Sequence, residues 1–246
     1  MSETISIEVE NISKSFGDNR ALDGISIDFS GNIIHGIVGP AGAGKTTLLR
    51  IMLSLMKQDS GEINYKLADQ KIDFAKIRNE IAYMPQQQSL YADLSIEEHM
   101  EFFANLYNIS KNEYEKLSKT LYDITRLEKF RDRPAGKLSG GMYKKLGLMC
   151  TLLRSPKIIL LDEPTNGVDP ISRREFWEIL NETAGNNVLI IMTTAYMDEA
   201  ERCGCVHLME KGKLLASGEP QQLLKNENVA NFDEFFIHRA QKQEKK

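Results

Sequence analysis

The sequence has 246 residues, of which 31 are Lys or Arg and 35 are Asp or Glu, so its formal net charge is -4. This length fits one large domain, or one domain with an inserted lobe. Hydrophobic residues make up 41% of the chain, which is enough to form a full core. The mild acidity argues against a duplex-binding protein, because phosphate contacts need a basic surface. The longest aliphatic runs are far below the ~20 residues of a membrane-spanning helix.

The first third of the chain alternates strand-like segments with turn residues. Strands are predicted at 5–9, 25–29, 33–38, 61–65 and 81–84. Residues 46–56 are apolar on nearly every face, which predicts a buried helix. Because neither a charged start nor an apolar core precedes the first strand, we expect no signal peptide.

The sequence pattern becomes typical of helices after Pro85. Ser95 and Glu98 form a capping-box pattern, and Ser110 with Glu113 repeats it, so two helices are expected to begin there. We therefore predict a helical lobe over 86–150. Further on, elements are predicted at 158–161, 172–183, 188–192, 197–202 and 206–209.

The alternation of strands and helices on both sides of the lobe predicts an α/β fold with a mainly parallel sheet. We expect a single domain over 1–246, in which residues 1–85 and 151–225 form the α/β core and 86–150 the helical subdomain. The last segment, 226–246, is polar and is expected to be a C-terminal tail.

A glycine-rich segment after the third strand fits the P-loop pattern. It runs Gly39, Pro40, Ala41, Gly42, Ala43, Gly44, Lys45, Thr46 and Thr47, between a predicted strand and a predicted helix. Small residues let successive backbone N–H groups point at one anion at the helix start. Lys45 adds a cation for the β- and γ-phosphates, and Thr46 a hydroxyl for Mg²⁺.

A second motif places two carboxylates at the end of a buried strand. Asp162 follows Ile158–Leu161, where it can hold a magnesium ion, and Glu163 is suited to orient or deprotonate a water molecule. An acidic strand end that merely faces solvent is the alternative, and the P-loop disfavours it.

A third motif, Leu138-Ser139-Gly140-Gly141-Met142, lies 23 residues before Asp162 and begins a helix with Ser139 as its natural N-cap. With the other two motifs in this order, the chain resembles an ATP-binding cassette (ABC) protein over roughly 6–218. The resemblance implies a P-loop NTPase core, an antiparallel β subdomain and the inserted helical subdomain.

The resemblance also implies roles for single residues. Phe16 matches the aromatic that stacks on adenine, although a core aromatic is the alternative; Gln86 matches a glutamine that contacts Mg²⁺ and joins core to lobe. Gln87 and Gln88 follow, so this assignment can shift along the chain. Asp169 lies in a segment that crosses between subunits, and Glu163, Lys45 and Gln86 form the expected catalytic set.

The family resemblance implies head-to-tail pairing of two cassettes. ATP is then held between the P-loop of one and Ser139, Gly140 and Gly141 of the other, with Mg²⁺ on Thr46, Gln86 and Asp162. ATP binding closes the pair and hydrolysis opens it. A separate transmembrane permease is the expected partner, at the cytoplasmic face of the membrane.

One position departs from the family pattern. Ala195 stands where most members have a histidine that contacts the γ-phosphate, and a methyl group donates no hydrogen bond. Loss of one such donor costs about 10²–10³ in rate, so we expect weakened hydrolysis. Either an asymmetric heterodimer or a slow homodimer would accommodate this. Met142 and Lys144 also depart from the common form and are expected to matter less.

These features predict an ATP-hydrolysing transporter subunit, similar to those of ABC-2-type exporters. Two alternatives stay open: a regulatory ATP-binding partner that hydrolyses little, and a soluble ABC ATPase outside transport. No nucleic-acid footprint is evident. Cys150, Cys203 and Cys205 match neither a disulfide framework nor a zinc spacing and are expected to be reduced thiols.

Overall fold

The structure, a computed structural model, describes residues 5–68, 70–87 and 90–244. It divides into two compact units, one of residues 1–78 and 189–246 and one of residues 79–188. The division into a core of 1–85 with 151–225 and a lobe of 86–150 stays a prediction. Gln88 lies outside the described residues. In the described ranges no helix has both the length and the apolar character needed to cross a bilayer.

The first unit holds two groups of strands and several helices. Its strands are β1 (Ile5–Phe16), β2 (Asn19–Ser30), β3 (Ile34–Val38), β4 (Ser60–Leu67), β5 (Gln70–Ile72), β8 (Leu189–Thr194), β9 (Cys205–Glu210) and β10 (Lys213–Gly218). Its helices are α1 (Lys45–Met52), α2 (Phe74–Ile77), α7 (Met197–Ala200), α8 (Pro220–Glu227) and α9 (Phe232–Glu244). A short 3₁₀ turn, Arg78–Glu80, follows α2.

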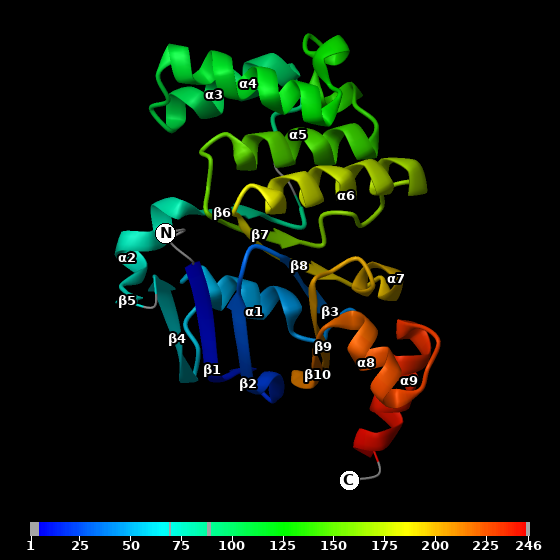
Figure 1. The fold of residues 1–246 in the computed structure, drawn as a ribbon. Helices are drawn as coiled ribbons and strands as arrows, with labels where there is room; N and C mark the ends of the chain where they lie inside the picture. The colour runs from blue at the N-terminus through cyan, green and yellow to red at the C-terminus, as the bar shows by residue number, and fades with distance from the viewer. Residues whose placement is uncertain (1–4, 69, 88–89, 245–246) are drawn as a thin grey trace. The chain divides into compact units, whose positions relative to one another are not determined.

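An antiparallel sheet with the order β2-β1-β4-β5 forms one part of the first unit, as Figure 1 shows. Its long hairpin alternates, with Ile5, Ile7 and Val9 buried and the residues between them more exposed. The antiparallel β subdomain is therefore confirmed.

A second group of strands in the first unit surrounds β3. This strand pairs in parallel with β8 and with β9, and β9 pairs antiparallel with β10. All five residues of β3 and all six of β8 are buried, as expected for strands covered on both faces. The sequence expectation of a mainly parallel α/β sheet is confirmed.

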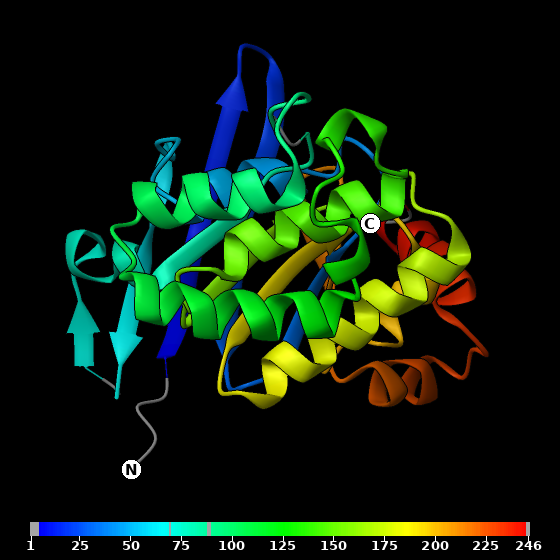
Figure 2. The same cartoon turned by 90° about the horizontal axis from the view of Figure 1, so that it is seen from above.

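The second unit is mostly helical. It contains β6 (Ile81–Met84), α3 (Ile96–Leu106), α4 (Lys111–Thr125), α5 (Gly140–Leu152), β7 (Ile158–Asp162), α6 (Pro170–Gly185) and the 3₁₀ turns Glu128–Phe130 and Ala135–Lys137. β6 and β7 pair in parallel. α3 and α4 both pack on α5 (Figure 2). The capping box of Ser95 and Glu98 forms as predicted.

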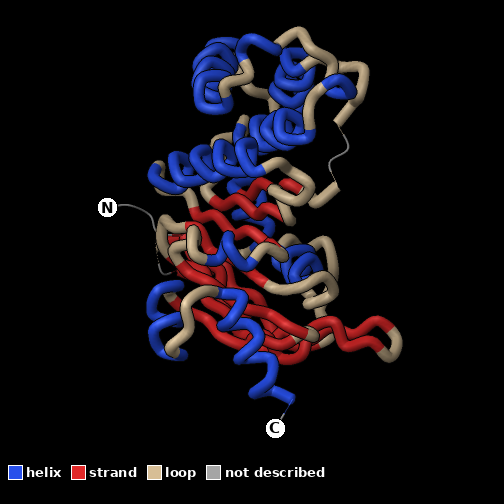
Figure 3. Tube along the Cα trace, turned by 90° about the vertical axis from the view of Figure 1, so that its right-hand side faces the viewer, coloured by secondary structure: helices blue, strands red, loops and turns tan. Residues whose placement is uncertain are grey.

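The segment after residue 226, expected to be a polar tail, contains the helix α9, the last helix before the C-terminus in Figure 3. Phe232 and Phe235 anchor it, because both side chains are buried, and α9 packs against α7 and α8. Two aromatic residues thus outweigh the polar composition of this segment.

Candidate functional site

The P-loop half-site (Gly39–Thr47) leaves the end of β3 in the first unit. The Gly39 N–H donates to the carbonyl of Thr194, 3.1 Å away, which fixes the loop against the end of β8. The hairpin turn between β9 and β10 supports it from another side, because the Gly212 N–H donates to the Ala43 carbonyl at 3.2 Å. The predicted strand, loop and helix therefore follow one another as expected.

Two glycines of the P-loop half-site are required by its shape. A Cβ at Gly39 would lie 2.1 Å from the carbonyl oxygen of Met209. Gly44 has φ of 100°, and a Cβ there would lie 2.4 Å from the Ala21 carbonyl oxygen. The backbone therefore approaches its neighbours more closely than a side chain would allow.

Lys45 begins α1 and is buried. Its Nζ donates to the carbonyls of Gly39 at 2.8 Å and Pro40 at 3.0 Å, so the ammonium lies over the loop itself. Gly44, the N-cap of α1, provides no side-chain hydrogen bond to the helix start, and the first turn holds no acidic residue. The helix dipole and this cation together favour an anion at the loop. Ala41 and Gly42 are exposed, and Thr46 and Thr47 are half-buried.

The carboxylate half-site (Gln86, Asp162 and Glu163) belongs to the second unit. β7 is buried throughout, and Asp162 at its end is only 1% exposed. The hydroxyl of Tyr83 lies 3.5 Å from its Oδ2. The predicted position of an acid at the end of a buried strand is confirmed.

Glu163 has a left-handed backbone with φ of 44°, which is uncommon for a residue with a side chain. Its Oε2 accepts hydrogen bonds from Gln86 Nε2 at 2.7 Å and Asn166 Nδ2 at 3.3 Å. Strained backbone held by its surroundings is typical of functional positions. The structure thus brings together two residues of the predicted catalytic set, Gln86 and Glu163.

Lys144 joins this half-site, although the sequence suggested that it would matter less. Its Nζ donates to the backbone carbonyl of Gln86 at 3.0 Å. Burial lowers the pKa of Lys144, and the negative charges of Glu163 and Asp162 oppose that shift. No local pattern reveals this contact, because residues 86 and 144 are far apart in the sequence.

The Leu-Ser-Gly-Gly segment begins α5 as predicted. The Ser139 hydroxyl accepts a hydrogen bond from the Met142 N–H at 3.3 Å and caps the helix. A Cβ at Gly141 would lie 2.4 Å from Ser172 Cβ and Oγ, so glycine is needed where α5 meets the start of α6. Gly140 has more room, with the Gly167 carbonyl oxygen 3.6 Å from its notional Cβ.

Two further candidates occupy defined places. Asp169 is the N-cap of α6, and its Oδ1 accepts from the N–H groups of Ile171 at 3.1 Å and Ser172 at 3.0 Å. The bond from Ser172 chiefly lowers the pKa of this carboxyl group. Phe16 is 47% exposed, with Lys14 Nζ 5.7 Å from its ring centroid. This exposure rules out the alternative that Phe16 is a core aromatic.

Ala195 follows β8 in the first unit and is exposed. It comes directly after Thr194, the residue that binds Gly39, so the position of the missing histidine adjoins the start of the P-loop half-site. The four histidines are engaged elsewhere: His35 bonds His207, His99 bonds Ser95, and His238 pairs with Glu227. No local histidine replacement is therefore evident among the described residues.

A P-loop, a strand-end carboxylate pair and a Leu-Ser-Gly-Gly helix start on this fold define an ATP-binding cassette domain. The family described as "ABC transporter" matches residues 22–166, and this chain belongs to that family.

Named relatives agree with this assignment. The chain is 44% identical over 212 residues to the "Probable multidrug ABC transporter ATP-binding protein YbhF" of Escherichia coli (strain K12), covering 84% of this chain and 36% of that protein. It therefore spans about a third of the length of that relative. It is also 34% identical over 222 residues to the "Nod factor export ATP-binding protein I" of Burkholderia lata, covering 90% of this chain and 73% of that protein.

Solved structures show the same fold. A structure titled "Structure of ATP binding subunit of ABC transporter" superposes with a TM-score of 0.81 at 26% identity, covering 95% of this chain and 99% of its own. The cbiO1 protein from Clostridium perfringens, described as part of the ABC transporter complex cbiONQ, superposes with a TM-score of 0.79 at 26% identity, covering 90% and 91%.

Proposed function

We propose that this chain binds ATP through the P-loop half-site. The carrying observation is the start of α1, where Lys45 lies over the loop carbonyls and Gly44 leaves the helix start without a side-chain cap. Backbone N–H groups with a neighbouring ammonium form a binding site for a polyphosphate. Phe16, exposed at the end of β1, is available to stack on a purine.

The donor set also fits magnesium, because this ion prefers hydroxyl, amide and carboxylate oxygens. Thr46, Gln86 and Asp162 are the residues that would hold it. When bound, Mg²⁺ neutralises charge on the phosphates. We propose that both half-sites act on the same type of nucleotide, ATP with Mg²⁺.

The proposed activity is hydrolysis of ATP to ADP and phosphate. Glu163 would orient the attacking water and draw its proton toward the carboxylate, while Gln86 and Asn166 hold its Oε2 atom in place. Lys45 would stabilise charge that develops on the transferred phosphoryl group.

A second candidate is a regulatory subunit that binds ATP and hydrolyses it little. Ala195 favours it, because its methyl group cannot donate a hydrogen bond where most members of the family have a histidine. A soluble ABC ATPase outside transport remains the third candidate, with no specific contact in its favour.

We infer that the chain works as one half of a head-to-tail pair, in which Ser139, Gly140 and Gly141 serve nucleotide held by the partner cassette and Asp169 lies in the crossing segment. The glycine-rich start of α5 supports this, because such a helix start favours an anion, even though Ser139 caps the Met142 N–H. Either a second copy or a different cassette can complete the pair, and Ala195 favours a different one.

We further propose a role in transport, with a separate transmembrane permease at the cytoplasmic face of the membrane. The names of relatives, one multidrug and one Nod factor export ATP-binding protein, favour export over uptake.

The test is steady-state phosphate release from ATP with Mg²⁺, measured for the purified chain alone and with a candidate permease in proteoliposomes. An export motor gives slow turnover alone and faster turnover with the permease. A regulatory subunit binds ATP and stays inactive in both conditions. Failure of the folded chain to bind ATP would overturn the proposal.

A further inference from the structure

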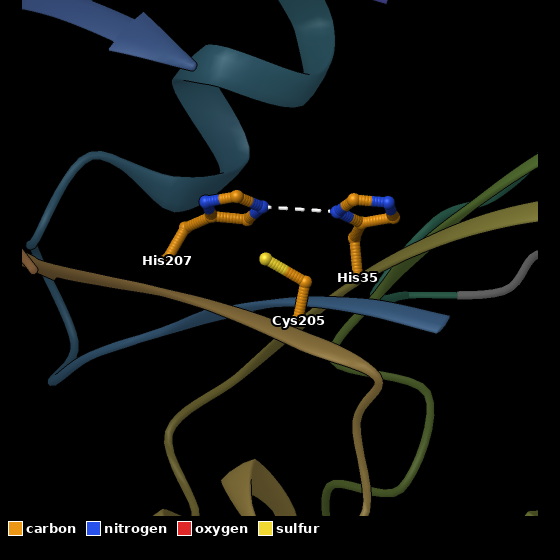
Figure 4. A group of neighbouring side chains, drawn as sticks. All are labelled: His35, Cys205 and His207. Carbon is orange, nitrogen blue, oxygen red and sulfur yellow. Dashed lines mark hydrogen bonds between the residues drawn. The ribbon is translucent and has the colours of Figure 1, made fainter. Parts of the chain in front are cut away.

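A cluster of two histidines and one cysteine lies on one face of strands β3 and β9 in the first unit. Alternate residues of a strand point to the same face, so Cys205 and His207 on β9 share one. The parallel register pairs Cys205 with His35 of β3, which brings the third side chain to that face. Figure 4 shows the three side chains turned toward one another.

The spacing of the three side chains suits one metal ion. His35, Cys205 and His207 each offer a ligand atom, and these atoms lie within 4.8 Å of one another. His35 Nδ1 and His207 Nε2 are 3.1 Å apart. Two nitrogens bound tetrahedrally to zinc at about 2.0–2.1 Å lie about 3.3 Å from each other, so the two nitrogens are already close to the separation that zinc needs.

The outer nitrogens of both rings have partners that suit metal ligands. His35 Nε2 lies 2.9 Å from the Ser30 carbonyl oxygen, so this nitrogen carries the proton and Nδ1 keeps its lone pair. His207 Nδ1 lies 2.8 Å from the Ser217 hydroxyl, which can accept a hydrogen bond from Nδ1–H and leave the Nε2 lone pair for the metal. Such outer partners are the usual support of metal-bound histidines.

The surroundings keep the two histidine rings neutral. Phe29 packs edge-on against both rings, with centroids 5.4 Å from His35 and 4.9 Å from His207. Burial, with a smaller contribution from His35, lowers the pKa of His207 to about 3. Neutral imidazole is the form that binds metal. Cys205 is only half-buried, which leaves a route for entry.

Without a metal, the two histidines can bond each other in a chain from Ser217 to Ser30, and this chain needs no thiol. The Cys205 side chain, turned toward the facing nitrogens in Figure 4, adds a third ligand that a structural histidine pair does not require. Imidazole and thiolate together select zinc-like ions, whereas Mg²⁺ prefers oxygen ligands.

We propose that His35, Cys205 and His207 bind one Zn²⁺ ion, with water in the fourth position and release of the Cys205 thiol proton to solvent. The sequence did not suggest this site, because His35 is 172 residues from His207. The ion would join β3, which leads into the P-loop half-site, to β9, whose hairpin turn supports Ala43.

The test titrates the metal-free full chain with Co²⁺, a coloured substitute for Zn²⁺, and records the absorption spectrum. One equivalent should bind, with the strong visible bands of a tetrahedral ion and a thiolate-to-metal charge-transfer band. Cys205→Ser should lose the charge-transfer band, whereas Cys203→Ala should keep it. Circular dichroism confirms that each variant is folded.

Ser217→Ala supplies a second variant at an exposed position. Loss of an outer partner typically weakens metal affinity about 10- to 100-fold, measured by Zn²⁺ competition with a chromophoric chelator. Zn²⁺ should also raise the Tm of the wild-type chain and leave that of Cys205→Ser unchanged. No stoichiometric Co²⁺ binding, or a charge-transfer band that persists in Cys205→Ser, would overturn the proposal.

Discussion

The P-loop half-site and the carboxylate half-site have opposite chemistry. The first presents backbone N–H groups and the Lys45 ammonium, with no acidic residue in the first turn of α1. The second presents the carboxylates of Asp162 and Glu163, and its donors, from Gln86 and Asn166, hold Glu163. We propose that the first attracts an anion and that the second holds a cation and orients a water molecule.

The two helix starts differ in the same sense. α1 begins without a side-chain cap, whereas the Ser139 hydroxyl caps α5. A glycine-rich helix start therefore lacks a side-chain cap in one place and has one, on the Met142 N–H, in the other. We conclude that variants near the P-loop should change ATP affinity, and variants near Glu163 should change turnover.

The largest expected effect is on turnover. Glu163→Gln removes the proposed base and should lower phosphate release by about 10²–10⁴-fold, the usual contribution of general base catalysis. ATP affinity should stay unchanged, because the P-loop half-site is intact. Glu182→Gln, an exposed glutamate on α6, is the matched control. Equal turnover by Glu163→Gln and the wild-type chain would contradict this role.

The next effect is on affinity. Lys45→Ala removes the cation over the loop and should weaken ATP binding, measured by calorimetric titration, about 100-fold, since charge-assisted hydrogen bonds contribute about 1.5–3 kcal/mol each. Lys57→Ala, which removes an exposed positive charge from the same unit, should bind as the wild type does. Unchanged affinity of the folded Lys45→Ala chain would break the comparison.

Ala195→His restores the histidine that most members of the family have after this strand, and so tests whether its contact with the γ-phosphate matters here. A histidine there should raise turnover about 10- to 100-fold, somewhat less than the usual cost of removing a preorganised donor. Ala195→Ser should change turnover little, because the serine side chain is too short to reach the γ-phosphate. If Ala195→His gives no gain while ATP still binds, the missing donor does not limit hydrolysis.

Lys144→Met sharpens the description of the carboxylate half-site. It keeps most of the side-chain length but removes the hydrogen bond to the Gln86 carbonyl, and should lower turnover about 3- to 10-fold, a loss of about 0.5–1.5 kcal/mol. ATP affinity should not change, and Lys137→Met is the control at an exposed position. If Lys144→Met lowered ATP affinity but not turnover, Lys144 would act in nucleotide binding and not in hydrolysis.

The smallest effect concerns stability. Ser139→Ala removes the cap of α5 and should lower the free energy of unfolding by about 1 kcal/mol, seen as a reduced Tm. Ser110→Ala, which uncaps α4, should cost a similar amount. Neither should alter ATP affinity of the isolated chain; a large affinity loss in Ser139→Ala alone would show that α5 contacts nucleotide within one molecule.

Local sequence patterns predicted much of this structure. The P-loop sequence determines strand, turn and helix together, and the Ser95 and Ser139 caps follow from side chains a few residues from the groups they bind. Contacts between distant segments left no such pattern: Lys144 with Gln86, and His35 with His207. The helix α9 was missed because two buried phenylalanines, Phe232 and Phe235, stabilise a segment of polar composition.

The central claim is that the P-loop half-site at the start of α1 binds phosphate. The most direct test follows the backbone amide signals of the ¹⁵N-labelled chain by NMR during addition of ATP and Mg²⁺, at concentrations where the chain is monomeric. The amide signals of Gly42, Gly44 and Thr46 should shift, and the signal of Met142, capped by Ser139, should stay in place. A shift at Met142 with unchanged P-loop signals would contradict the account.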